Sequence, residues 1–193
     1  FSFSQQTING SITHGGLQRD YILYVPTSYS PGTDLALVLN FHGYTSNAWQ
    51  QAFYSNFNTV AENEGFIVIH PEGTTNNQGS QFWNAGNQFW NINNIDDVSF
   101  ISNLIDTITS QYNINTDRIY SLGMSNGGFM SYRLSCELSD KIAAIASVTG
   151  SMGQSQIESC NPERPIPIRQ IHGTSDQVVE YSGNDLFGFA SIE

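Results

Sequence analysis

The chain is poor in positive charge. Its 193 residues include six Lys and Arg against seventeen Asp and Glu, which gives a formal net charge of −11. A surface this acidic repels phosphate backbones and anionic lipids, so we expect neither nucleic acid nor a membrane surface among its partners. Apolar runs are also short, and none approaches the ~18 residues that a membrane-spanning helix needs.

Cysteine and proline are scarce as well. Cys136 and Cys160 are the two cysteines, and there are six prolines against seventeen glycines. Two cysteines are compatible with one disulfide or with two buried thiols. The first residue is Phe1 rather than Met, which is compatible with a processed N-terminus or with a boundary of the given segment. This composition is typical of a secreted protein, so we expect an extracellular or periplasmic location. Neutral drift within a family is the alternative explanation of the composition.

The length and the apolar pattern predict one α/β domain over residues 1–193. This length provides one sizeable core and is too short for two. Continuous apolar runs are typical of strands buried on both faces of a parallel sheet. Such runs occur at Leu35–Phe41, Phe66–Ile69, Ile119–Leu122, Ile142–Val148 and Ile166–Ile171.

Helical patterns separate these runs, and a hairpin precedes them. The spacing predicts helices over Asn47–Glu64, Asp96–Tyr112 and the residues from Ser125 to Leu138. Thr7–Thr13 and Arg19–Val25 alternate like two antiparallel strands around a glycine turn. The sequence therefore predicts a mostly parallel central sheet with an antiparallel N-terminal hairpin.

One short motif carries a candidate nucleophile. "YSLGMSNGGF" (120–129) places Ser125 between Gly123 and Gly127, after an apolar run and before a helical pattern. In such an elbow the glycines allow a tight strand-to-helix turn, with the serine exposed at its tip and a helix N-terminus facing the oxyanion. A glycine turn without chemistry is the alternative.

Two further strand ends add candidate partners. "LNFHGYTSN" (39–47) ends a strand at His42, and the main-chain amide of Tyr44 could join that of Asn126 as an oxyanion donor. "IHGTSDQVVEY" (171–181) ends a later strand near Asp176. In α/β hydrolases the triad follows the order serine, acid, histidine, so Asp176 falls where the acid belongs.

Together with these motifs, the rest of the chain resembles a known family. The relevant stretches are "FHGY", "HPEG", "WNAG", "IDDVSFI", "RIYSLGMSNGGFMSYRLSCEL", "IAAIASVTG" and "IHGTSDQVVEY". In this order they resemble the esterase/polyhydroxybutyrate depolymerase family, which includes feruloyl and acetylxylan esterases. The resemblance runs from about Leu23 to the end of the chain. It implies an α/β-hydrolase fold, secretion, a Ser-Asp-His triad, and neither metal nor cofactor.

The resemblance also assigns roles to residues outside the elbow. His42 matches the family's oxyanion-loop histidine, which orients that loop beside the substrate. Cysteines occupy the positions of Cys136 and Cys160, so the resemblance implies a disulfide between them. Removing such a cross-link restores the conformational entropy of the unfolded chain.

The triad histidine is missing from the expected place. The four histidines are His14, His42, His70 and His172, and none follows Asp176. His172 is the tempting substitute, but it matches the family's strand-end "HG" instead. The family's histidine would follow one more strand, and Ser191 has the pattern of a helix N-cap. We therefore expect the domain to be incomplete at its C-terminus, truncated before its last strand, and at best weakly active alone.

The segment 72–94 predicts a long aromatic loop. Phe82, Trp83, Phe89 and Trp90 could wall a substrate cleft or pack against the sheet edge. Among them, Trp83 and Trp90 are our substrate-binding candidates. Asp96 and Asp97 precede a helical pattern and are interpreted as helix caps.

The leading hypothesis is a secreted serine carboxylesterase. Ser125 would attack an ester of the polyhydroxyalkanoate, feruloyl or acetyl type, and the substrate would be small, a polyester or a plant cell-wall polysaccharide. Two alternatives stay open: a non-catalytic carbohydrate- or polymer-binding relative, and an acyltransferase on the same fold.

Overall fold

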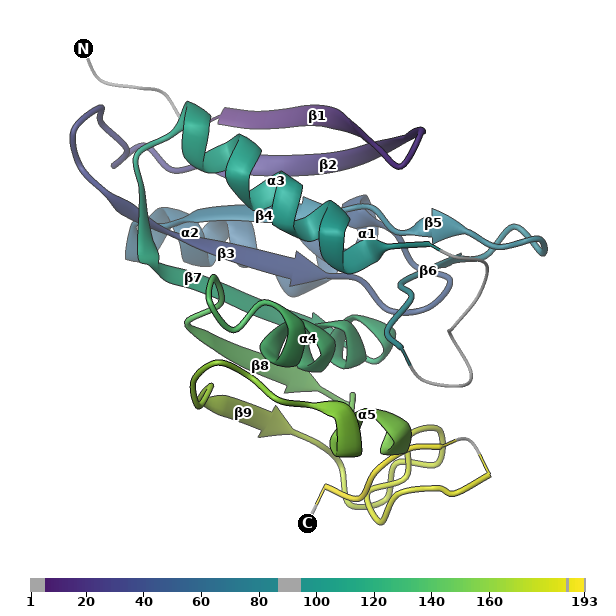
Figure 1. The fold of residues 1–193 in the computed structure, drawn as a ribbon. Coiled ribbons are helices and arrows are strands. Elements are labelled where there is room, and N and C mark those ends of the chain that lie inside the picture. Colours follow the sequence, from purple (N-terminus) through teal and green to yellow (C-terminus); the bar gives the residue numbers. More distant parts are fainter. Residues whose placement is uncertain (1–5, 87–94, 187, 193) are drawn as a thin grey trace.

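The computed structural model describes residues 6–86, 95–186 and 188–192. Its main sheet has the strand order β1-β2-β4-β3-β7-β8-β9 (Figure 1). These strands are β1 (Gln6–His14), β2 (Leu17–Val25), β3 (Leu35–Phe41), β4 (Ile67–Pro71), β7 (Ile114–Met124), β8 (Ala144–Val148) and β9 (Ile168–Ile171). A separate two-stranded sheet contains β5 (Thr74–Thr75) and β6 (Gln81–Phe82).

The sheet is antiparallel at one side and parallel over the rest. β1 pairs with β2, and β2 with β4, in antiparallel register, whereas β4, β3, β7, β8 and β9 are mutually parallel. In Figure 1 the arrows of β3, β7, β8 and β9 point to the same side. The carboxyl ends of the parallel strands therefore share one edge, where an α/β fold places its ligand site.

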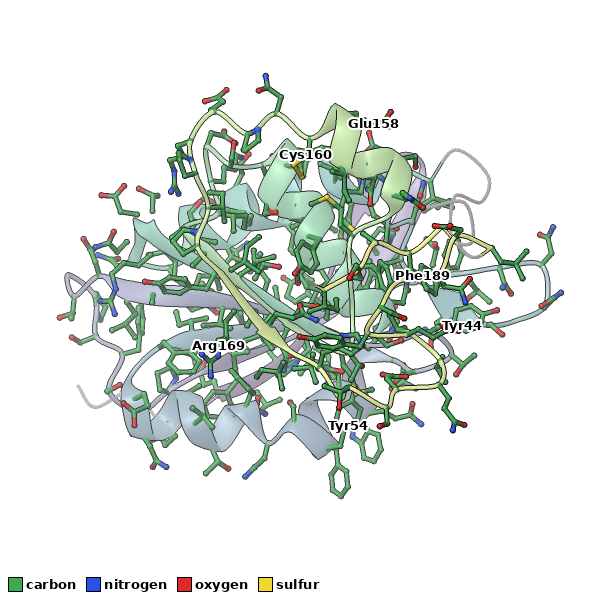
Figure 2. All side chains as sticks on the ribbon, turned by 90° about the horizontal axis from the view of Figure 1, so that it is seen from below. Tyr44, Tyr54, Glu158, Cys160, Arg169 and Phe189 are labelled. Carbon is green, nitrogen blue, oxygen red and sulfur yellow. A yellow bond between two sulfur atoms is a disulfide. The ribbon has the colours of Figure 1, made fainter. Side chains whose placement is uncertain are left out.

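Helices cover both faces of this sheet. They are α1 (Ala48–Ser55), α2 (Phe57–Glu64), α3 (Asp97–Gln111), α4 (Asn126–Glu137) and α5 (Gln154–Ser159). α3 and α4 lie on one face, and α1 and α2 lie on the other (Figures 1 and 2). This three-layer arrangement confirms the predicted α/β-hydrolase fold with its N-terminal antiparallel hairpin. Within the described residues, no helix is long and apolar enough to cross a membrane.

Burial along the strands shows where the sheet is covered. Every residue of β3 and β4 is buried, as continuous apolar runs predict. Buried and half-buried residues alternate in β8, and most of β9 is exposed, with Ile168 and Ile171 about half exposed. β9 lies at the outer side of the described sheet, so only β8 pairs with it.

The predicted helix over 47–64 is two helices. Asn56 adopts a left-handed conformation (φ 53°, ψ 27°) between α1 and α2. Asparagine tolerates this region better than most residues. The Asn56 carbonyl then accepts the Thr59 amide, which starts α2 in a new direction. The single-helix prediction was wrong because the apolar spacing continues across the break.

One loop prediction changes. Part of the segment 72–94 is ordered as the β5–β6 hairpin rather than as an open loop. The helix start expected at Ser191 stays a prediction, because the structure describes one residue after it. The amide of that residue, Ile192, donates to the Tyr181 carbonyl at 3.0 Å.

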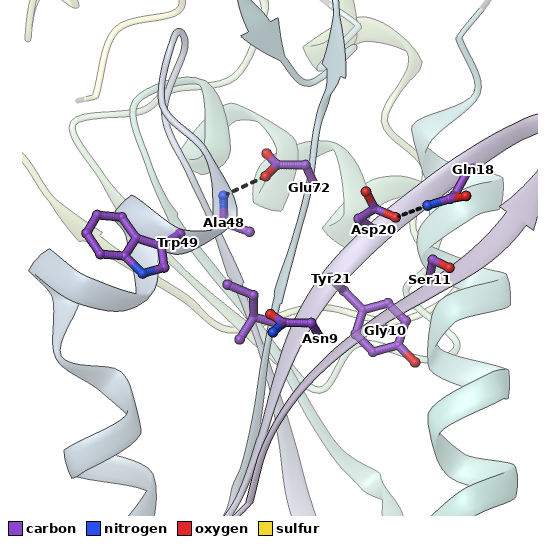
Figure 3. A pocket seen from close by; sticks show the side chains of 10 residues that line it. Asn9, Gly10, Ser11, Gln18, Asp20, Tyr21, Ala48, Trp49 and Glu72 are labelled. Atoms are coloured by element: carbon purple, nitrogen blue, oxygen red, sulfur yellow. Dashed lines mark hydrogen bonds between the residues drawn. The ribbon is translucent and has the colours of Figure 1, made fainter.

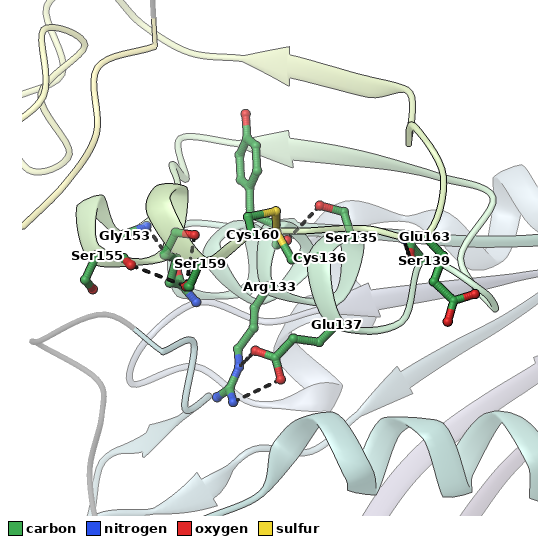
Figure 4. Close-up of a disulfide and its surroundings, with 12 residues drawn as sticks. Arg133, Ser135, Cys136, Glu137, Ser139, Gly153, Ser155, Ser159, Cys160 and Glu163 are labelled. Carbon is green, nitrogen blue, oxygen red and sulfur yellow. Dashed lines mark hydrogen bonds and ion pairs between the residues drawn. A yellow bond between two sulfur atoms is a disulfide. The ribbon is translucent and has the colours of Figure 1, made fainter.

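A disulfide joins Cys136 to Cys160 and confirms the pairing that the resemblance implied. Cys136 is in the last turn of α4, and Cys160 follows the last residue of α5. Figure 4 shows the bond between the two helices, beside the Arg133–Glu137 ion pair on the exposed side of α4. The bridge fixes α5, a helix with no buried residue, to the body of the domain.

Candidate active site

Ser125 lies at the junction between β7 and α4. Its backbone has φ 52° and ψ −120°, a conformation that an L-residue rarely adopts. Such a conformation costs roughly 1–3 kcal/mol, and the surrounding structure must enforce it. Here the Ser125 amide donates to the Val148 carbonyl at 2.8 Å, and the Ser125 carbonyl accepts from Phe129 in α4.

The two glycines of the elbow are required by close backbone contacts. A Cβ on Gly123 would lie 2.4 Å from the carbonyl carbon of Gly127. A Cβ on Gly127 would lie 2.4 Å from the main-chain oxygen of Phe41. Neither approach is possible for real carbon atoms, so α4 reaches the β3–β7 edge only because both positions lack side chains. The sequence motif therefore has a steric cause in this fold.

The turn after β3 lies directly against the serine. An added Cβ on Gly43 would be 3.6 Å from the Ser125 Cβ. Tyr44 is the next residue, and its hydroxyl accepts a hydrogen bond from the Asn76 side chain at 3.1 Å. Asn126 is the first residue of α4, whose N-terminus carries partial positive charge. The turn and the helix N-terminus thus approach Ser125 from two sides.

His42 fixes the conformation of that turn. Its side chain is fully buried, and its Nδ1 donates to the Gly43 carbonyl at 2.8 Å. Its Nε2 accepts the Gly73 amide at 2.9 Å and lies 3.1 Å from Glu72 Oε1. We assign the proton to Nδ1 because the Gly73 N–H needs an acceptor. With no exposed surface, His42 contacts the main chain on both sides rather than a substrate.

Trp83, which we expected to contact the substrate, also lies elsewhere. It is fully buried, it packs edge-on against Phe41, and its Nε1 donates to the His42 carbonyl at 3.1 Å. The Asn126 side chain accepts from the Trp83 amide and donates to the Trp83 carbonyl. Trp83 therefore packs beneath the site. Phe82 is also buried, and Phe89 and Trp90 lie outside the described residues.

Asp176 follows β9 at the same sheet edge. Its Oδ1 accepts the amides of Val178 and Val179 at 2.9 and 3.0 Å. Its Oδ2 lies 3.6 Å from the Nε2 of His172. In the sheet order, β9 is separated from β7 by β8 alone. Adjacent strands are about 4.8 Å apart, so the strand ends that carry Ser125 and Asp176 are about 10 Å apart.

Each of the four histidines has bonds elsewhere. His172 donates to the Val179 carbonyl at 2.6 Å and accepts from Gln170 at 2.9 Å. His14 contacts Asn103 on α3, and His70 bonds to Asn58. Burial lowers the pKa of His70 to about 4. Among the described residues, no hydrogen bond joins a histidine to Ser125.

Sequence reasoning missed one buried polar cluster beside the site. Arg19 pairs with Asp97 at 2.6 Å, and both side chains are almost completely buried. The second oxygen of Asp97 accepts the Asn84 amide at 2.7 Å, next to Trp83. Only Asp96 caps α3, through the Ser99 amide, so interpreting Asp97 as a cap was wrong. The sequence did contain a signal for this burial. Asp97 lies on the same helix face as the apolar residues Ile101 and Leu104, and such an apolar face packs against the core.

Comparison with solved structures places the fold among esterases. A thermostable esterase matches with a TM-score of 0.69 at 20% identity, covering 94% of this chain and 50% of that one. The acetyl xylan esterase of Aspergillus awamori matches with a TM-score of 0.62 at 21% identity, covering 78% of this chain and 53% of that one. At such identities the likeness shows the shared fold.

Proteins with related sequences include acetylxylan and feruloyl esterases. The bifunctional acetylxylan esterase/xylanase XynS20E of Neocallimastix patriciarum is 33% identical over 91% of this chain. Feruloyl esterase B of Piromyces equi is 35% identical over 86% of it. The chain spans 24% and 30% of the lengths of these two relatives. Because residues 19–160 match the sequence model of the Esterase PHB depolymerase family, the chain belongs to that family.

Proposed function

We propose that the chain carries the nucleophile of a serine carboxylic ester hydrolase. The observation that carries the proposal is the strained backbone of Ser125 at the N-terminus of α4, with the Gly43 turn against its Cβ. A protein that only binds has no use for such a strained serine. Membership of an esterase family supports the same conclusion.

The proposed reaction begins with attack of Ser125 Oγ on the ester carbonyl carbon. The carbonyl π electrons move to oxygen, and the main-chain amides of Asn126 and Tyr44 stabilise the resulting oxyanion. Its collapse expels the alcohol, which takes the proton that Oγ lost, and leaves an acyl-enzyme. Water then attacks the acyl carbon, the bond between that carbon and Ser125 Oγ breaks, and the proton that the water loses returns to Oγ as the acid leaves. His42 is a positioning residue, because its two bonds set the turn that presents the Tyr44 amide.

The base that accepts the proton of Ser125 Oγ must be a residue other than the four histidines described above. We propose that Asp176 orients a histidine contributed by a segment outside residues 1–193. Two observations support this: the Asp176 carboxylate is fixed by two amides at the catalytic edge, and the outer strand β9 exposes Ile168 and Ile171. A following strand that covers β9 would bring its own loop to this edge.

For the substrate, we propose an acetyl or feruloyl ester on a plant polysaccharide, cleaved outside the cell. The relatives named above are acetylxylan and feruloyl esterases, and the disulfide is typical of an oxidising compartment. Nothing in this chemistry requires a metal or a redox cofactor.

Turnover of p-nitrophenyl acetate and of acetylated and feruloylated xylan by the full-length protein tests the proposal. Ser125→Ala should lower kcat/KM by at least about 10⁴-fold, because the nucleophile is lost. Ser155→Ala, on the exposed side of α5, is the matched control and should hydrolyse as the wild type does. Activity that survives in Ser125→Ala would point to another nucleophile and overturn the assignment.

A further inference from the structure

Helix α1 presents two aromatic side chains to solvent beside the N-terminal hairpin. Trp49 is 64% exposed and Phe53 is 75% exposed. They are four residues apart and share one helix face. Their ring planes stack with the centroids 5.5 Å apart and 6° between the planes. Each ring fixes the orientation of the other, so the pair forms a preorganised flat platform on a surface where large aromatic side chains are normally buried.

Hollows lie on both sides of Trp49. One, of about 440 Å³, lies between α1 and the hairpin, with Trp49 at one side and Gln18 and Asp20 at the other (Figure 3). A second, of about 500 Å³, extends along α1 past Phe53. Both are lined by Asn9, Ile22 and Trp49, so the two hollows adjoin at Trp49, and we refer to them together as the groove.

The groove continues to the catalytic edge. A third hollow of about 440 Å³ shares Gln18, Asp20 and Glu72 with the first and reaches Gly73 and Gln81. The Gly73 amide donates to His42, and the Gln81 carbonyl accepts the Thr45 amide. His42 and Thr45 belong to the turn after β3, which lies against Ser125. A long ligand in the groove would therefore lead from the aromatic platform to the loops that surround Ser125.

Among the described residues, the groove lining mixes polar and apolar side chains and lacks free positive charge. Strand alternation places Thr7, Asn9 and Ser11 on the groove side, while Ile8 and Ile12 pack on the core. The charged groups in the hollows are carboxylates, apart from the Arg19 guanidinium, which is paired with a buried aspartate. A chain with a formal charge of −11 repels an anionic polymer. Hydroxyl and amide groups beside a flat aromatic pair suit the hydroxyls and the apolar ring faces of neutral sugars.

We propose that this groove, running along α1, the hairpin and the β5–β6 loops, binds a stretch of neutral polysaccharide backbone, with one sugar ring stacked on the Trp49–Phe53 platform. It is a binding site separate from the Ser125 elbow, and it would hold a polymer whose ester substituents reach that elbow. The inference rests on the proposed function only in the choice of polymer.

The test is the affinity of the full-length protein for xylohexaose, an unsubstituted neutral oligosaccharide, by titration calorimetry. Trp49→Ala should weaken binding at least about tenfold, because truncating a central aromatic anchor removes most of its contact. Phe53→Ala should weaken it less. Ile157→Ala, which removes a 51% exposed apolar side chain from α5, is the matched control and should bind as the wild type does. Oligogalacturonate, an anionic probe, should bind at least about tenfold more weakly than xylohexaose.

Three results would overturn the inference: xylohexaose affinity unchanged in Trp49→Ala, equal affinity for oligogalacturonate, or a wild-type dimer that Trp49→Ala converts to a monomer. The last would make the platform an interface between two copies. Because xylohexaose carries no ester, its binding is independent of hydrolysis. A wild-type protein that hydrolyses esters but does not bind xylohexaose would remove this inference alone. A wild-type protein that binds xylohexaose but hydrolyses no ester would remove the proposed function alone.

Discussion

The guanidinium of Arg19 and the carboxylate of Asp97 form a buried ion pair that joins strand β2 to helix α3. The Arg19 Nη2 lies 2.6 Å from Asp97 Oδ1, and the guanidinium lies 3.9 Å from the centre of the Phe100 ring. Asp97 Oδ2 accepts the Asn84 amide. One carboxylate thereby connects the hairpin, α3 and the segment that carries Trp83 beneath the Ser125 turn.

Breaking this pair should be costly. Asp97→Asn leaves the Arg19 charge buried without its partner, and we expect a loss of about 3–5 kcal/mol in the free energy of unfolding. Asp106→Asn is the matched control, because Asp106 pairs with Lys141 on the surface and is 63% exposed. An exposed pair contributes about 0–1 kcal/mol. Urea denaturation of both variants measures the difference, and equal losses would contradict the structural role of Asp97.

The elbow glycine Gly127 should not tolerate a methyl group. The added Cβ of Gly127→Ala would lie 2.4 Å from the Phe41 carbonyl oxygen, so α4 must shift away from β3. We expect a loss of about 1–3 kcal/mol in unfolding free energy and a fall in ester turnover, because the Ser125 turn moves with the helix. Gly173→Ala, where an added Cβ meets nothing within 4 Å, is the control. Wild-type stability and turnover in Gly127→Ala would refute the steric explanation of the motif.

Buried His70 should make stability depend on pH. Burial lowers its pKa from 6.5 to about 4, so between these values the unfolded chain binds a proton that the folded chain does not. Stability should therefore be complete above about pH 6.5 and should fall as the pH drops toward 4, by up to about 3 kcal/mol. Unfolding free energies across this range, compared between the wild type and His70→Gln, measure the effect. Parallel pH profiles for the two proteins would assign the acid sensitivity to other groups.

The disulfide should stabilise the domain by restricting its unfolded chain. Cys136 and Cys160 are 24 residues apart, and closing a loop of this length contributes about 3 kcal/mol. The double variant Cys136→Ala/Cys160→Ala should lose about that much unfolding free energy. Dithiothreitol should destabilise the wild type and leave the variant unchanged. A double variant as stable as the oxidised wild type would show that the bridge contributes nothing to stability.

Sequence patterns alone were enough to predict the class of the fold and the elbow. Continuous apolar runs and helical spacing are local properties, and they reflect how each strand and helix is buried. The Gly-Ser-Gly spacing also acts locally, because the tight turn needs its glycines within a few residues of Ser125. For this reason the β3, β4 and α3 regions, the hairpin and the serine turn could all be located from the amino-acid sequence.

Only the tertiary structure decided which polar side chains are buried and what they contact. His42 and Trp83 have substrate-facing motifs in the sequence, yet both are fully buried and bond to main-chain groups. Asp97 has the sequence position of a cap but pairs with Arg19, a residue 78 positions away. Such contacts depend on sheet order and on helix packing across distant segments, and a local pattern carries no information about either. The exposed Trp49–Phe53 pair is the converse case, because an aromatic residue in a helix is expected in the core until the packing shows it in solvent.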